Sequence, residues 1–184
     1  MLYYKEGAII KILGIDTGSK GYYCVLDPEQ RTAEYMRIPY RADGVMNCHK
    51  LDHAFEGFGN IHKIYIEKVI GRGGAIKDGG ANWGASQNFG LGFNYGQVMS
   101  YMSNCPITLV MPKQWQKLCH DHSVKGLGIT AKERTRARFD QLNPSYGGII
   151  KSHDGLHDAF FIARYGLLQM RINFRDDWNF IELG

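Results

Sequence analysis

Residues 12–27, ILGIDTGSKGYYCVLD, decide the fold, because two apolar runs in this stretch flank a short polar turn. The first run ends in DTG at 16–18, a turn signal, and the second ends before Pro28. A third run, residues 32–38, alternates apolar and polar side chains and ends before Pro39. The order strand, turn, strand, turn, strand predicts an antiparallel meander.

Helices and strands alternate after this meander. The segment that begins at Thr130 carries a capping box, with Glu133 three residues later, which marks the start of a helix. We expect helices at 43–57, 89–103, 113–119, 130–142 and 154–171, and strands at 61–69 and 107–111. This order predicts an α/β fold with a mixed sheet, whose later strands are reached by helical crossovers.

Composition limits the class of protein. The chain has 184 residues, of which 44% are hydrophobic and 22% charged, and this excludes a disordered polymer. Its size favours one domain, expected at 1–171, followed by a tail at 172–184 whose Trp178 and Phe180 dock either on this domain or on a second subunit. No apolar run is long enough for a membrane span, and the first residues lack a signal-peptide pattern. Four scattered cysteines favour a reducing cytosol.

Four acidic residues stand where a site can form. Asp16 ends the first strand, Glu67 lies on strand 61–69, and Asp154 and Asp158 share one face at the start of the last helix. Like charges at that spacing repel, and a buried carboxylate without a partner is costly. A divalent cation offsets this repulsion, and Mg²⁺ prefers oxygen ligands. Two such ions can activate water and stabilise the leaving oxygen of a phosphodiester.

Three of these acids also have a purely structural interpretation. Asp16 would shape the turn that follows it, Glu67 would pair with a neighbouring lysine, and Asp154 is a favoured N-cap residue. Asp158 lies in a nearly all-apolar helix and is the hardest to explain in this way. The metal interpretation therefore depends on the four positions together.

The order and spacing of Asp16, Glu67, Asp154 and Asp158 resemble those of the acidic residues in the RuvC-type Holliday junction resolvases of the ribonuclease H-like superfamily. The chain resembles the phage-type branch of this family more closely than the bacterial one. Three further stretches carry the resemblance, GLGFNYGQVMSY at 90–101, MPKQWQK at 111–117 and HDGLHDAFFIARYG at 153–166. It spans about residues 12–168. It implies a ribonuclease H-like mixed sheet with three antiparallel N-terminal strands and flanking helices.

The resemblance also implies a metal site. Its ligands would hold Mg²⁺ or Mn²⁺, two ions per active site, and they carry over to Asp16, Glu67, Asp154 and Asp158. In the bacterial enzymes the last two acids are three residues apart, whereas here position 155 is glycine and the partner of Asp158 lies four residues away. His153 or His157 is an alternative to Asp154. His157 ranks behind it, because at about 100° per residue it points away from Asp158.

Basic residues indicate a nucleic-acid surface. The net charge of +4 divides into +5 on residues 111–151 and −1 elsewhere. A solvated basic helix would also explain this stretch, but beside a carboxylate metal site it favours a phosphate-binding face. The glycine-rich segment 71–84 adds a loop with an aromatic side chain for stacking on a base, unless it is a surface loop without function. The expected DNA-binding residues are Arg72, Lys77, Trp83, Lys113, Lys117, Lys132, Arg134, Arg136 and Arg138.

Lys113 and Lys117 flank Trp115, and the resemblance suggests that one of them is catalytic, in contact with the phosphate near the metals. In the alternative interpretation Trp115 belongs to the core and the lysines only extend past it to solvent. Cys48, His49 and His53, together with the segment CHDH at 119–122, contain the residue types of zinc ligands. Neither group has a recognised spacing, so a structural zinc is left open.

The function implied is a metal-dependent, structure-selective endonuclease that resolves four-way DNA junctions by paired phosphodiester hydrolysis, leaving 5′-phosphates. Paired cuts imply a homodimer, for which helix 89–103, with its small residues, is the candidate interface. Alternatives are a non-catalytic branched-DNA-binding module and a ribonuclease H-like nuclease that acts on flaps or RNA–DNA hybrids. An actin-like ATPase or sugar kinase needs two lobes and a longer chain. We expect a cytoplasmic, phage-encoded protein that acts in a bacterial host, without a membrane partner.

Overall fold

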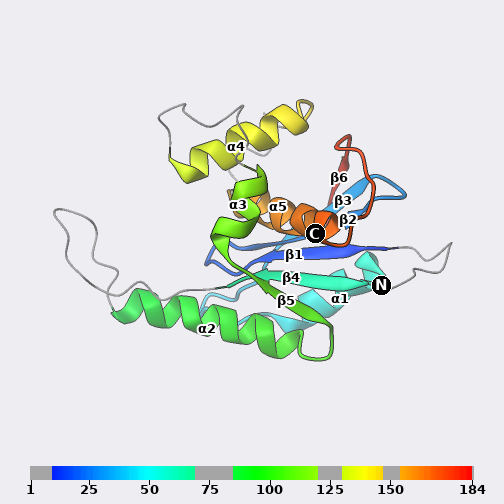
Figure 1. The fold of residues 1–184 in the computed structure, drawn as a ribbon. Coiled ribbons are helices and arrows are strands. Elements are labelled where there is room, and N and C mark those ends of the chain that lie inside the picture. The colour runs from blue at the N-terminus through cyan, green and yellow to red at the C-terminus, as the bar shows by residue number, and fades with distance from the viewer. Residues whose placement is uncertain (1–9, 69–84, 120–129, 147–153, 184) are drawn as a thin grey trace.

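Six strands form one mixed sheet with the order β5-β4-β1-β2-β3-β6 in the computed structural model, which describes residues 10–68, 85–119, 130–146 and 154–183. Helices cover both faces of this sheet (Figure 1). The strands are β1 (Ile12–Asp16), β2 (Tyr22–Asp27), β3 (Thr32–Arg37), β4 (Lys63–Glu67), β5 (Ile107–Val110) and β6 (Asn179–Glu182). The helices are α1 (Cys48–Phe58), α2 (Ala85–Tyr101), α3 (Pro112–Cys119), α4 (Ala131–Leu142) and α5 (Asp154–Gln169).

The antiparallel meander predicted from the first strands is confirmed. Tyr22 pairs with Asp16 across the first turn and with Arg37 on the other side, so β2 lies between β1 and β3. β4 then joins β1 in parallel, and β5 joins β4 in parallel. The predicted mixed sheet with three antiparallel N-terminal strands and flanking helices is therefore present.

The first helix begins later than predicted. The sequence favoured a helix from residue 43, whereas α1 begins at Cys48. The preceding segment forms a turn instead, in which Tyr40 pairs with Met46 and the N–H of Gly44 donates to a backbone carbonyl. The Asn47 side chain then accepts a hydrogen bond from the backbone of the helix, so the cap sets where α1 starts.

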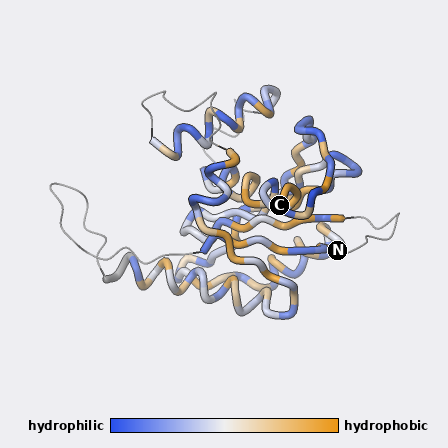
Figure 2. Tube along the Cα trace, viewed as in Figure 1, coloured by the Kyte–Doolittle hydropathy of each residue, from blue (hydrophilic) through white to orange (hydrophobic). Residues whose placement is uncertain are grey.

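Alternation along the strands separates two hydrophobic cores. Ile12 and Tyr65 belong to the core beneath α5, α3 and α4, whereas Leu13 and Ile64 belong to the core above α1 and α2. Figure 1 shows the two helical layers, and Figure 2 shows apolar colour concentrated on the sheet and polar colour along α4. None of the described helices is both long and apolar enough to cross a membrane.

Helix α5 lies unusually close to β1. A Cβ atom added at Gly14 would come within 2.2 Å of the backbone oxygen of Ala159, so only glycine fits there. This contact fixes the helix across the strand. The start of α5 therefore lies at the carboxyl end of β1, where Asp16 stands.

The C-terminal residues add a strand that the sequence analysis did not predict. β6 pairs in parallel with β3, and Phe180 packs with its ring centroid 5.3 Å from Phe139 and 5.6 Å from Phe160. Arg164 on α5 forms two 2.8 Å hydrogen bonds to Asp176. Of the two alternatives for the tail, the structure shows docking on its own domain.

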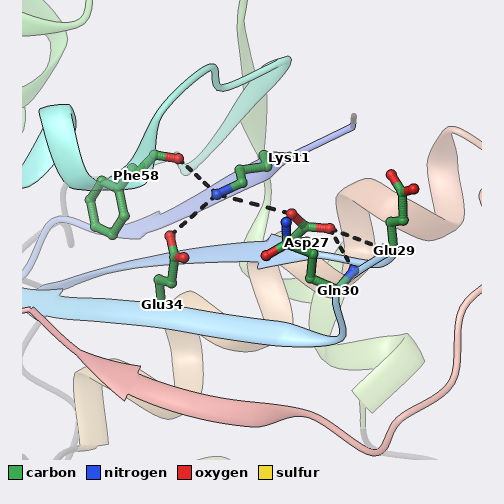
Figure 3. A network of polar contacts seen from close by, with 6 residues as sticks. All are labelled: Lys11, Asp27, Glu29, Gln30, Glu34 and Phe58. Atoms are coloured by element: carbon green, nitrogen blue, oxygen red, sulfur yellow. Dashed lines mark hydrogen bonds and ion pairs between the residues drawn. The ribbon is translucent and has the colours of Figure 1, made fainter. Parts of the chain in front are cut away.

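A network of charged side chains occupies the end of β1 that lies away from Asp16 (Figure 3). The Lys11 Nζ atom donates to the carbonyl oxygen of Phe58 at 3.0 Å and lies 3.5 Å from Glu34 Oε2 and 4.0 Å from Asp27 Oδ2. The second oxygen of the buried Asp27 accepts two backbone N–H groups of the β2–β3 turn. Lys11 therefore supplies a counter-charge to both carboxylates through ion pairs, and the backbone supplies hydrogen bonds to one oxygen of Asp27.

Candidate functional site

Two of the predicted acids end adjacent parallel strands. Asp16 is the last residue of β1 and Glu67 the last residue of β4, and the register pairs the residues just before them, Ile15 and Ile66. Since side chains alternate along a strand, Asp16 shares the face of Ile12, and Glu67 shares the face of Tyr65. Both carboxylates therefore lie on the α5 side of the sheet, at the same edge.

Asp158 completes a group of three partly buried carboxylates. It lies in the second turn of α5, and its pKa is raised well above the usual value by burial and by the charges of Asp16 and Glu67. Burial raises the pKa of Asp16 to about 6, although the N–H of Gly18, 3.1 Å from its Oδ1, opposes the shift. Burial and the Asp16 charge raise the pKa of Glu67 to about 7. Each of the three acids is thus destabilised in its ionised form.

The chemistry of this donor set fits a hard divalent cation. Carboxylate oxygens are the ligands that Mg²⁺ and Mn²⁺ accept, and a cation would remove the unfavourable charge of the ionised acids. In the part of the chain that the structure describes, however, no three His, Cys, Asp or Glu side chains meet closely enough to hold a metal ion. The acids share an electrostatic environment, but they do not form a ligand cluster as they stand.

Asp154, the fourth predicted ligand, lies apart from the other three. It is the first residue of α5, its side chain is 42% exposed, and its Oδ2 lies 2.6 Å from Nζ of Lys132 on α4. From the sequence, Lys132 is expected to contact DNA, and this ion pair is not expected. Lys132 also lowers the pKa of both Asp16 and Asp158, so its ammonium group lies within electrostatic range of the site.

The residue at position 155, between the two predicted metal ligands on α5, must be glycine. A Cβ atom at this position would lie 2.3 Å from the carbonyl oxygen of Lys20 and 2.9 Å from Oδ2 of Asp16. An acidic side chain three residues before Asp158 is therefore sterically excluded. His157, one of the histidine alternatives, is buried with its ring centroid 4.5 Å from that of Phe139, whereas His153 lies outside the described residues.

Trp115 is part of the core, as one of the two interpretations held, but it also contacts an acid of the site. Its indole Nε1 donates to Oε1 of Glu67 at 3.0 Å. This contact was not expected from the sequence, because the two residues lie 48 positions apart in the chain. Val110 of β5 pairs with Glu67, so the first turn of α3 starts beside that carboxylate. Lys113 and Lys117 are exposed on the same helix.

The predicted basic helix borders the same group of acids. The capping box is confirmed, since the Glu133 carboxylate accepts from the N–H of Thr130 at 2.7 Å and the Thr130 hydroxyl accepts from the N–H of Glu133. Thr135 and Phe139 turn the buried face of α4 inward, which leaves Lys132 exposed and Arg134, Arg136 and Arg138 partly exposed. The other predicted DNA contacts, Arg72, Lys77 and Trp83, lie outside the described residues.

The histidine and cysteine groups show no shared centre where they are described. Cys48 is exposed, and its sulfur lies 3.9 Å from the backbone oxygen of Met46, whereas Cys119 is buried. All four cysteines are free thiols. The remaining members of the second group, 120–122, lie outside the described residues.

This architecture is similar to that of solved structures. No family model matches the sequence, and no curated protein matches it. Among solved structures, RuvC of T. thermophilus in complex with its Holliday junction substrate matches 88% of this chain and 95% of its own, with 14% identity and a TM-score of 0.53. A structure of Thermus thermophilus RuvC matches 90% of this chain and 99% of its own, with 16% identity and a TM-score of 0.45. The first of these matches shows that the chain has the fold of RuvC, a ribonuclease H-like mixed sheet with flanking helices.

Proposed function

We propose that this protein is a metal-dependent, structure-selective endonuclease that resolves four-way DNA junctions by paired phosphodiester hydrolysis, leaving 5′-phosphate ends. The observation that carries the proposal is the group of three partly buried carboxylates, Asp16, Glu67 and Asp158, at one edge of a ribonuclease H-like sheet. Their raised pKa values reflect burial, and for Glu67 and Asp158 also neighbouring acids, which the Lys132 ammonium group offsets only in part at Asp16 and Asp158. Perturbed carboxylates of this kind cluster at functional sites. The implied place of action is the cytoplasm of a bacterial host, on phage DNA.

The three acids, joined by Asp154, are the residues that would hold Mg²⁺ or Mn²⁺. Two bound ions would supply activation of water and stabilisation of the leaving oxygen. Asp16 and Glu67 lie on rigid strands, and the close contact of Gly14 with α5 fixes the helix that presents Asp158. For Asp154 to join them, its ion pair with Lys132 must open. That lysine would then be free to neutralise a phosphate.

The proposed DNA surface surrounds the acids with positive charge. Trp115 of α3 donates a hydrogen bond to Glu67, and Lys132 of α4 forms an ion pair with Asp154. The two basic helices therefore both border the site. Phosphate contacts of this kind position a substrate without reading its sequence. The proposed contacts are Lys113 and Lys117 on α3, Lys132, Arg134, Arg136 and Arg138 on α4, and Arg72, Lys77 and Trp83 in the glycine-rich segment.

A second copy of the chain is the proposed partner, with α2 as the interface. Phe89 and Phe93 are 74% and 42% exposed and stack at 6.1 Å between ring centroids, which leaves a large apolar surface in water. A groove of about 550 Å³ continues this surface past Gly96 to Tyr101. A four-way junction presents two equivalent strands for cutting, and a two-fold dimer presents two equivalent sites.

Cleavage of a labelled synthetic four-way junction in Mg²⁺ or Mn²⁺ tests the proposal, with flap, RNA–DNA hybrid and duplex substrates alongside. We expect the junction to be cut in paired positions and Asp158→Asn or Asp16→Asn to lower the rate at least about 1,000-fold, because metal chemistry contributes several kcal/mol to the barrier. Asp177→Asn is the matched control, since this acid is exposed and pairs with Arg31 away from the site.

The outcomes separate the alternatives. Tight junction binding without cutting in either metal would favour a non-catalytic module. Faster cutting of flaps or hybrids would favour the same chemistry on another substrate. Full activity of Asp158→Asn or Asp16→Asn would overturn the metal site itself.

A further inference from the structure

Two tryptophans are buried in the described part of the chain, and they differ in their hydrogen bonding. Trp115 is 1% exposed and donates from Nε1 to Oε1 of Glu67 at 3.0 Å. Trp178 is 4% exposed, and its Nε1 has no hydrogen-bond partner among the described residues. The fold thus tolerates a buried indole without a partner, so burial alone does not require the bond to Glu67.

The position of Trp115 is fixed by its own helix start. Met111 follows β5 directly, and its backbone N–H donates to Oε1 of Gln114 at 2.8 Å. The backbone N–H of Gln114 donates in turn to the carbonyl oxygen of Met111 at 2.9 Å. These two bonds close the first turn of α3. The indole then packs in the core that also contains Leu156 and Phe160 of α5, which leaves it no room to rotate away.

In the hydrogen bond between Trp115 and Glu67, the indole can only donate and the carboxylate oxygen accepts. An indole N–H is a donor with no acceptor capacity, so its partner must be a lone pair, here on one carboxylate oxygen. The bond holds Oε1 of Glu67 and leaves Oε2 for another partner. Groups that orient a metal-binding side chain in this way tune the metal affinity of the site.

We propose that Trp115 is a positioning residue, which holds the Glu67 carboxylate through Oε1 and so presents Oε2 to a divalent cation. This inference rests on the proposed nuclease function, in which Glu67 is a metal ligand. Lys113 and Lys117, one of which the resemblance suggests as catalytic, lie on the same helix but are exposed. Trp115 acts through Glu67 and not on the substrate.

Binding of Mn²⁺ to the intact protein without DNA, followed by the electron paramagnetic resonance signal of free Mn²⁺, tests the inference. Trp115→Phe keeps an aromatic ring and removes only the N–H donor. We expect it to weaken Mn²⁺ binding by about 10- to 100-fold. Trp178→Phe is the matched control and leaves Mn²⁺ binding unchanged, since its indole N–H has no partner among the described residues.

The Glu67→Gln background separates this inference from the proposed function. If Trp115 acts through Glu67, adding Trp115→Phe to Glu67→Gln changes Mn²⁺ binding no further. If Glu67→Gln itself binds Mn²⁺ like the wild type, the proposed metal site fails. If Glu67→Gln weakens binding and Trp115→Phe does not, only the role of Trp115 is overturned.

A measurement on the wild-type chain avoids any dependence on the folding of Trp115→Phe. With ¹⁵N-labelled tryptophan, the three indole N–H resonances are assigned by comparing the wild type with Trp178→Phe and Trp83→Phe. We expect Mg²⁺ to shift the Trp115 indole resonance and to leave that of Trp178 in place. A Trp115 resonance that stays unmoved while Mg²⁺ binds would overturn the proposal.

Discussion

Buried or partly buried carboxylates lie at both ends of β1, but the charges around them differ between the two ends. At one end Asp27 and Glu34 share Lys11, and two backbone N–H groups satisfy the second oxygen of Asp27. At the other end Asp16 and Glu67 stand beside Asp158 and raise its pKa, as does burial. Lys132, the nearby cation, pairs with the half-exposed Asp154.

This difference separates a structural cluster of acids from a functional one. A cluster that carries its own counter-charge stabilises the fold and has no use for an outside ion. A cluster whose acids resist ionisation stores unfavourable energy, which a bound cation would release. The Lys11 network (Figure 3) is thus the internal reference against which the proposed metal site is judged.

The largest expected effect of a single substitution on folding stability belongs to the Lys11 network. Lys11→Met leaves Asp27 and Glu34 without their cation, and removing one partner of a buried ion pair costs about 3–5 kcal/mol. We expect the free energy of unfolding, measured by urea denaturation, to fall by this amount. The junction-cleavage rate of the folded variant remains that of the wild type, because Lys11 lies at the far end of β1. A change in unfolding free energy below about 1 kcal/mol would contradict the role of Lys11 as the counter-charge of Asp27 and Glu34.

The functional end is expected to show an inverted pH dependence of stability without metal. Because burial raises the pKa of Asp16 to about 6 and of Glu67 to about 7, the folded state holds protons that the unfolded chain has already released near pH 4. The contribution of these two protonated carboxyl groups to the free energy of unfolding is therefore fully present below pH 4 and is lost as the pH rises to 7. Each carboxylate contributes about 2–3 kcal/mol to this fall, measured by denaturation in a chelating buffer.

Two further measurements, on Glu67→Gln and with added Mg²⁺, test whether these acids cause the fall in stability between pH 4 and pH 7. Glu67→Gln matches the wild type at pH 4 and exceeds it in stability at pH 7.5, because the amide carries no charge to bury. Saturating Mg²⁺ stabilises the wild type more at pH 7.5 than at pH 5, since the metal binds the ionised acids. A wild-type stability that rises between pH 4 and 7 in the chelating buffer, together with a Glu67→Gln variant that gains nothing, would contradict the assignment.

The smallest expected effect concerns Asp154, and it compares this acid with the three central acids of the site. Asp154→Asn breaks an exposed ion pair with Lys132, so unfolding free energy falls by only about 0.2–1 kcal/mol. We also expect this variant to lose less junction cleavage than Asp158→Asn, because Asp154 is half-exposed and stands apart from the three central acids. Equal losses in the two variants would place Asp154 among the principal metal ligands.

Much of the fold followed from local patterns. The meander was readable because turn signals separate the strands, and the start of α4 because Thr130 and Glu133 form a capping box. The strand predicted at 61–69 is present as β4, on which Glu67 shares a face with Tyr65. The sequence missed β6, because four residues of an edge strand carry little periodic signal and this strand depends on packing against β3.

The sequence by itself determined the order of the elements from β1 to α5, the position of Asp16 at the end of the first strand and the basic charge of residues 111–151. These properties are local, since they depend on hydrophobic spacing, turns and caps a few residues apart. Only the tertiary structure decided which side chains meet. The parallel pairing of β1 and β4, the glycine contacts of α5 and the packing of α3 and α4 bring Glu67 to Trp115 and Asp154 to Lys132. Such contacts join residues far apart in the chain, and no local pattern encodes them.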